Sequence, residues 1–192
     1  MARSFTLDTN CLIALENNEP ASPAVREIVV AHEQGKVDVA VVAISASERQ
    51  RDKPQLENFS EFQDRLAALD LRAVSILPTI SYWGLSFWDR CIWADEELVA
   101  FEKQIHEVLF PTTPFSWSDF CAANGLEVET SLQGSKWRNH KCDVLALWSH
   151  IHASRDVFVT DDDNFHKTEK KSALIRLGAG RIERATMAAT LL

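Results

Sequence analysis

Apolar residues along this chain form short continuous runs separated by segments of helical periodicity. Continuous apolar runs are typical of strands buried on both faces, as in a parallel sheet. The strongest predicted strand covers residues 37–44, of which residues 39–44 are continuously apolar, and shorter mainly apolar segments cover residues 5–7 and 157–159. Residues 74–78 suit either a short strand or an extended link closed by Pro78, and we expect residues 173–177 and 181–182 to supply a last edge element.

Between these runs, apolar residues recur at the three- and four-residue spacing of amphipathic helices. This spacing predicts helices over residues 11–15, 22–34, 59–69, 98–109 and 143–151. Strands and helices alternate, so the pattern predicts an α/β fold around a central, mainly parallel sheet. The length of the chain suits one domain, and we expect that domain to span the whole chain.

Residues from about 79 to 135 interrupt this alternation. Trp83, Trp88 and Trp93 recur there at five-residue spacing. Exposed indole rings can stack nucleobases, whereas clustered aromatic residues also pack local cores and subunit interfaces. We interpret the segment as a helical elaboration of the domain.

Composition narrows the class of protein. The chain has 192 residues, of which 46% are hydrophobic and 25% charged, as expected of a globular protein with a core. No apolar stretch approaches the ~20 residues of a membrane helix. Asp8 comes too early for a signal peptide, and the four cysteines form no CxxC pair, so we expect a cytoplasmic protein. The net charge of −8 argues against a broad basic surface for nucleic acid, but it suits a cluster of acids or a basic partner.

Acidic residues follow three of the predicted strands. They are Asp8 after residues 5–7, Glu48 after residues 37–44, and Asp161, Asp162 and Asp163 after residues 157–159. The carboxyl ends of parallel strands meet at one edge of a sheet, where open α/β folds bind ligands. Neighbouring carboxylates repel one another unless solvent, amides or a cation offset their charge. A hard divalent cation prefers these oxygen ligands.

Each acid also has a structural explanation. Asp8 can cap the helix that follows it, and the acidic turn at residues 161–163 can cap the next one. Ser45 and Glu48 have the spacing of a capping box. Asp143 stands in the first turn of its predicted helix, where the helix dipole favours an acid. Taken one at a time, capping and metal binding explain these residues equally well. Taken together, the acids converge on one cleft, because Asp143 opens the helix before the last buried strand.

This arrangement resembles the PIN-domain nucleases. Four segments carry the resemblance: Leu-Asp-Thr-Asn at 7–10, Ser-Ala-Ser-Glu at 45–48, Asp-Val-Leu-Ala-Leu at 143–147 and Val-Thr-Asp-Asp-Asp-Asn-Phe at 159–165. The resemblance covers most of residues 1–78 and 136–192. It implies a three-layer α/β/α fold. The site residues that it implies are the acidic quartet Asp8, Glu48, Asp143 and Asp162, with Asn10 and Thr160 as supporting polar residues.

The resemblance also implies an activity. A Mg²⁺ or Mn²⁺ ion held by the quartet would activate water to cleave RNA phosphodiesters. Relatives usually leave a 5′-phosphate. Asn164 stands where the family often has a further acid, so the number of ions stays open, with Asp161 and Asn164 as additional candidate ligands. Many relatives are toxins restrained by an antitoxin, and many form dimers. The resemblance therefore implies three partners: an RNA substrate, an antitoxin protein and a second copy of this chain.

Basic residues near these segments are candidates for contact with substrate phosphates. They are Arg49, Arg138 and Lys141. A solvated helix face explains Arg49 as well. We expect His140 and His150 at the surface.

Two other functions fit part of the pattern. A phosphatase of the haloacid dehalogenase type also has an acidic α/β edge, but it requires a second aspartate two residues after the first, where this chain has Asn10. A PIN-like module that binds RNA or protein without cleaving it is the second alternative. All four core acids are present, which favours the enzyme.

Overall fold

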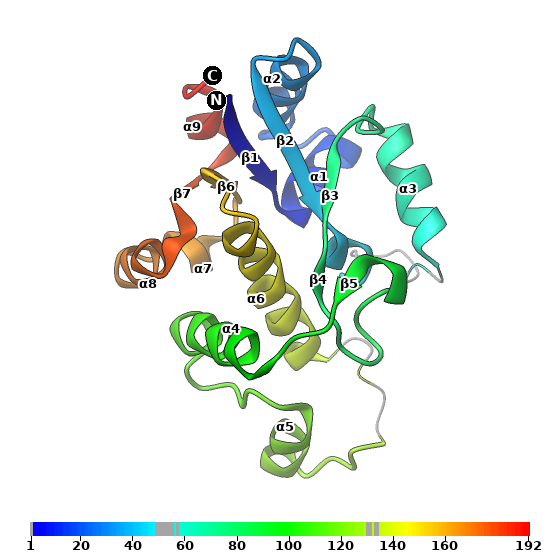
Figure 1. Ribbon diagram of the computed structural model, residues 1–192, viewed down its shortest axis with the longest axis vertical. Coiled ribbons are helices and arrows are strands. Elements are labelled where there is room, and N and C mark those ends of the chain that lie inside the picture. Colours follow the sequence, from blue (N-terminus) through cyan, green and yellow to red (C-terminus); the bar gives the residue numbers. More distant parts are fainter. Residues whose placement is uncertain (1, 49–55, 57, 130–131, 133–134) are drawn as a thin grey trace.

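The computed structural model describes residues 2–48, 56, 58–129, 132 and 135–192 (Figure 1). Its main sheet has five strands in the order β3-β2-β1-β6-β7, and every neighbouring pair is parallel. The strands are β1 (Arg3–Leu7), β2 (Val37–Val42), β3 (Ser75–Leu77), β6 (Val157–Val159) and β7 (Arg181–Glu183). The prediction of a central parallel sheet is confirmed.

Helices cover both faces of this sheet. One face is covered by α1 (Thr9–Asn17), α2 (Ser22–Glu33), α3 (Phe59–Ala68) and α9 (Ala185–Ala189). The other face is covered by α4 (Glu96–Leu109), α6 (Lys136–His152) and α8 (Thr168–Leu174). The expected three-layer α/β/α arrangement is therefore present.

The continuous apolar runs reflect these two covered faces. Along β2, Val39 and Val41 belong to the core under α2, whereas Ala40 and Val42 belong to the core under α6. Successive side chains of a strand point to opposite faces, so both sets must be apolar when both faces are covered.

Shorter elements complete the fold. They are the turns η1 (Ala43–Ala46), η2 (Trp88–Arg90) and η3 (Ile175–Ala179), the helices α5 (Trp117–Asn124) and α7 (Asp163–His166), and a two-stranded sheet of β4 (Thr79–Ile80) and β5 (Cys91–Ile92). The segment at 79–135 thus contains the helices α4 and α5, as predicted, together with a small sheet. Among the described residues, none of the helices combines the length and the apolar character needed to cross a membrane.

The order of the strands defines a switch point beside β1. The chain moves outward from β1 through β2 to β3, and returns to place β6 on the other side of β1. Leu7 lies opposite Val159, and the backbone N–H of Asp8 donates to the carbonyl of Val159 at 3.0 Å. Such a reversal leaves a crevice beyond the carboxyl ends of the strands, where α/β proteins bind ligands.

Candidate acidic site at the switch point

Asp8 lies at the centre of a hydrogen-bond network where β1 ends. Its side chain is buried, and its Oδ1 accepts from the backbone N–H of Thr9 at 2.8 Å, as the N-cap of α1. Its Oδ2 accepts from Asn10 Nδ2 at 2.8 Å and from Thr160 Oγ1 at 2.7 Å. The capping role predicted for Asp8 is confirmed, and the second oxygen is held by side chains from α1 and from the end of β6.

The same network fixes the acidic turn after β6. Asn10 Oδ1 accepts from the backbone N–H of Asp161 at 3.1 Å, and Thr160 Oγ1 accepts from that of Asp162 at 3.2 Å. Asp162 in turn caps α7, because its Oδ1 accepts from the backbone N–H of Asn164 at 2.8 Å. The hydroxyl of Thr160 therefore contacts both acids: it donates to the carboxylate of Asp8 and accepts from the backbone N–H of Asp162.

Glu48 follows the turn η1, and the structure corrects the capping-box prediction for this segment. Ser45 lies inside η1 instead of preceding a helix, and its hydroxyl accepts from Thr9 Oγ1 at 2.7 Å. This bond ties the turn after β2 to the start of α1. Glu48 is partly buried at the end of that turn.

Asp143 lies in the interior of α6, which corrects its predicted place in a first turn. The helix begins at Lys136, because Ser135 caps it by accepting from the backbone N–H of Arg138 at 3.1 Å. The favourable field at a helix start falls off within the first turn. The dipole explanation for Asp143 therefore does not apply.

The four acids interact electrostatically. Burial raises the pKa of Asp8 from 3.8 to about 6, and the charge of Asp162 adds to this rise. Burial, followed by the charges of Asp8 and Asp162, raises the pKa of Glu48 from 4.5 to about 7. Burial and the charges of Glu48, Asp8 and Asp162 raise the pKa of Asp143 well above 3.8. Every pair within the quartet is thus close enough for mutual repulsion, and the topology brings all four acids to one edge.

The structure corrects the expectation that Arg138 and Lys141 contact substrate phosphates, because both side chains are buried. Arg138 donates to the carbonyl of Ser47 from Nε at 3.1 Å and from Nη2 at 2.7 Å, and to that of Gly84 at 2.8 Å. Lys141 forms a buried ion pair with Glu102 at 2.6 Å. The third candidate, Arg49, lies outside the described residues.

Asp161 and Asn164 face other partners. The carboxylate of Asp161 lies 3.9 Å from Arg184, and the amide oxygen of Asn164 accepts from Lys170 at 2.6 Å. Within the described ranges, no three carboxylate, imidazole or thiol side chains stand in the arrangement of a formed metal site. The donor chemistry of the quartet nevertheless suits a hard divalent cation, because such ions prefer carboxylate oxygens.

Sequence reasoning missed the positioning role of Arg138. Its guanidinium holds the carbonyl of Ser47, the residue before Glu48, and so fixes the turn that carries this acid. A signal was present, because Arg138, Cys142 and Leu145 share one helical face and the other two are apolar. A cation on an apolar face indicates a buried side chain with partners elsewhere in the fold.

The similarity of this chain to known proteins is weak. No protein-family model matches the chain, and no curated protein matches it. Among solved structures, one similar chain comes from the crystal structure of VapBC2 from Rickettsia felis bound to a DNA fragment from their promoter. The identity is 14% and the TM-score 0.44, over 94% of this chain and 98% of that one. A likeness at this level assigns neither a family nor an activity.

Proposed function

We propose that this protein is a metal-dependent endoribonuclease of the PIN-domain type. The observation that supports this most is the set of mutually repelling acids Asp8, Glu48, Asp143 and Asp162 at the switch point. Burying several carboxylates together costs free energy unless a cation offsets their charge. Among the described residues, the cation whose charge reaches Glu48 is Arg65, and it is paired with Glu16 at 2.7 Å, so a divalent ion is the partner that fits.

The residues around the quartet would prepare it for binding. Asn10 and Thr160 hold Asp8 before an ion arrives, and Arg138 holds the turn that carries Glu48. Such supporting hydrogen bonds orient ligands and limit their reorganisation on binding. A bound Mg²⁺ or Mn²⁺ ion would supply an acidified water and stabilise charge on a phosphodiester.

Cleavage assays on single-stranded and structured RNAs test this proposal. We expect the purified protein to cleave RNA with Mg²⁺ or Mn²⁺, to leave 5′-phosphate ends and to stop in EDTA. Asp8→Asn and Asp143→Asn should reduce cleavage to background while the circular dichroism spectrum stays unchanged. Asp163→Asn is the matched control, because Asp163 lies beside Asp162 but is exposed and pairs with Arg184.

Two results would contradict the enzyme assignment. One is full cleavage by Asp143→Asn, which would place the activity elsewhere or in a contaminant. The other is an inactive wild-type protein across varied RNAs with Mn²⁺, which would favour the module that binds without cleaving. Hydrolysis of small phosphate esters in the same preparation would favour the phosphatase alternative.

We also propose that the enzyme acts in the cytoplasm as a toxin with an antitoxin partner, and that it forms a homodimer. These proposals rest on the resemblance of the four sequence segments to PIN-domain nucleases. Growth arrest on expression, relieved by co-expression of a neighbouring gene and absent for Asp8→Asn, would support the toxin role. Analytical ultracentrifugation of the purified protein tests the dimer.

A further inference from the structure

Three large indole side chains lie exposed on the surface in one row. Trp83, Trp88 and Trp93 are 82%, 58% and 78% exposed. The ring centroids of Trp83 and Trp88 are 5.8 Å apart, and those of Trp88 and Trp93 are 5.6 Å apart, so the three rings touch. A contiguous exposed aromatic surface is uncommon on a protein without a binding partner for it.

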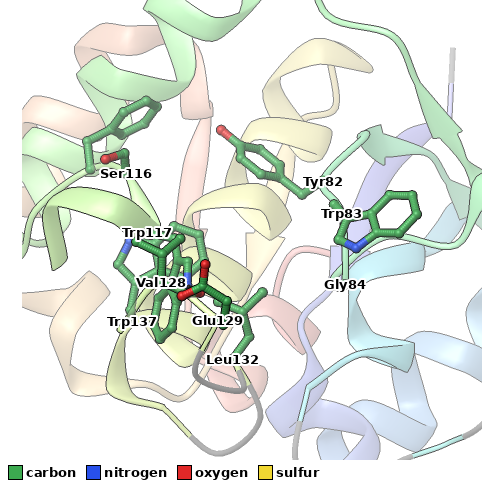
Figure 2. Close-up of a pocket in the computed structure, with 10 residues that line it drawn as sticks. Tyr82, Trp83, Gly84, Ser116, Trp117, Val128, Glu129, Leu132 and Trp137 are labelled. Atoms are coloured by element: carbon green, nitrogen blue, oxygen red, sulfur yellow. Dashed lines mark hydrogen bonds between the residues drawn. The ribbon is translucent and has the colours of Figure 1, made fainter. Parts of the chain in front are cut away.

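An aromatic cavity continues this row. The cavity has a volume of about 640 Å³, within the range of ligand pockets. Figure 2 shows Tyr82 and Trp83 on one side of it, with Trp117 and Trp137 on the other. Phe115 also lines it. Trp83 therefore belongs both to the cavity and to the exposed row.

Aromatic rings form most of the cavity lining, which also includes Ser116 and Glu129. The indole N–H groups of Trp117 and Trp137 donate to backbone carbonyls at 2.9 and 3.1 Å. The hydroxyl of Tyr82 donates to the buried carboxylate of Glu102 at 2.6 Å. Because the polar groups of these three side chains already have partners, their rings offer a ligand stacking and apolar contact.

The start of the segment that carries the row packs against the turn before Glu48. The hydroxyl of Ser47 donates to the carbonyl of Leu85, and Arg138 bridges the carbonyls of Ser47 and Gly84. Ser47 is bonded covalently to Glu48. The Trp83 segment is therefore fixed directly beside the turn that supplies one acid of the quartet.

We propose that the row Trp83–Trp88–Trp93 and the adjoining cavity form a track for single-stranded RNA, on which unpaired bases stack as the strand reaches the acidic site. This inference rests on the proposed nuclease function. Aromatic side chains bind single strands by stacking on the flat faces of the bases, with little dependence on sequence. Stacking needs no basic groove, which suits a chain with a net charge of −8. RNA fits better than a protein partner because the track leads to phosphodiester-cleaving residues.

The test measures RNA binding separately from cleavage. Fluorescein-labelled oligouridine and oligoadenosine are titrated with the Asp143→Asn protein in Mg²⁺, and binding is followed by fluorescence anisotropy. Adding Trp88→Ala or Trp93→Ala should weaken binding of both probes by about 5- to 140-fold, the loss expected for one stacked base. Trp93→Phe should retain most of the affinity. The loss should persist at high salt, because stacking releases no counterions.

Two controls separate stacking from general damage. Met187→Ala removes another exposed apolar side chain, on α9 in the opposite helical layer, and should leave binding unchanged. Thermal unfolding of the tryptophan variants should match that of the parent protein, since the removed rings are largely exposed.

The outcomes distinguish this inference from the proposed activity. Unchanged affinity in both alanine variants overturns the track, even if the wild-type protein cleaves RNA. Alanine variants that turn a dimer into a monomer with unchanged RNA affinity also overturn it, because the row then covers a second copy of the chain. Weakened binding with no cleavage by the wild-type protein supports the track and contradicts only the nuclease assignment.

Discussion

The acidic site predicts that the metal-free protein loses stability as the pH rises. The pKa of Glu48 is raised to about 7 by burial and by neighbouring carboxylates, and that of Asp143 is raised well above its ordinary value for the same reasons. Between the ordinary and the raised pKa, the folded protein holds protons that the unfolded chain has released. The free energy of unfolding therefore falls as pH increases through that window.

A buried histidine acts in the opposite direction at lower pH. Burial lowers the pKa of His150 from 6.5 to about 4. Between these values the unfolded chain binds the extra proton, so stability rises with pH there. At pH 6.5 the unfolded imidazole is still about half protonated, so His150 offsets about 0.4 kcal/mol of any loss between about pH 6.5 and 8.5. His140, whose pKa burial also lowers to about 4, acts in the same direction. Because both imidazoles are present in the wild-type protein and in Asp143→Asn, the difference between these two proteins reports on the acids.

The expected change over that range follows from linkage. A pKa of about 7 for Glu48 accounts for a loss of about 0.8 kcal/mol between about pH 6.5 and 8.5. Asp143 adds up to about 1.4 kcal/mol for each pH unit over which it stays protonated in the folded state. The wild-type protein in EDTA should thus lose more stability over this range than Asp143→Asn, in which the imidazoles largely offset the loss from Glu48.

Urea unfolding in EDTA at the two pH values measures this difference. Asp163→Asn serves as a control with an unchanged slope, because a hydrogen bond from Arg184 lowers the pKa of Asp163 and keeps it ionised throughout. Mn²⁺ should abolish the pH-dependent loss in the wild-type protein but not in Asp143→Asn. Equal slopes in wild type and Asp143→Asn would refute the reasoning.

Three further substitutions test particular contacts. Thr160→Val removes a donor to Asp8 and should weaken Mn²⁺ binding by about 10- to 100-fold, measured by calorimetry. Lys141→Met leaves Glu102 charged and buried, so urea unfolding should show a loss of about 3–5 kcal/mol, which adding Glu102→Gln should partly restore. Gly180→Ala should lower the melting temperature, because Gly180 has a φ of +58° and an added Cβ would lie 2.5 Å from a backbone oxygen.

The strands and their acidic ends were predictable because both faces of the sheet are covered. Burial on both sides favours apolar residues along a strand, although Thr6 is buried within β1, and the polar residue after the last apolar one follows the strand end, as at Asp8 and Thr160. The same reasoning predicted a strand that was too long at residues 37–44, because β2 ends at Val42 although the apolar run continues to Ile44. A buried turn is as apolar as a buried strand, and hydrophobicity alone does not separate them.

The partners of the buried cations were not predictable, because they are distant in the chain. Lys141 pairs with Glu102 across 39 positions, and Arg138 binds the carbonyl of Ser47 across 91 positions. Viewed along the sequence, these cations indicate a solvated basic segment, which also hid the true start of α6. His150 was misplaced for a similar reason, since it is buried between the hydroxyl of Thr6 and the carbonyl of Ala179.

Asp143 decides between the capping and the metal explanations of the quartet. Capping accounts for Asp8 and Asp162, each of which accepts from a backbone N–H at a helix start. It does not account for Asp143, which lies inside α6, partly buried beside other carboxylates. An ionised group there destabilises the metal-free fold, and a neutral residue of similar shape would remove that cost. A side chain that lowers stability and caps no helix is better explained by function, because active sites commonly trade stability for activity.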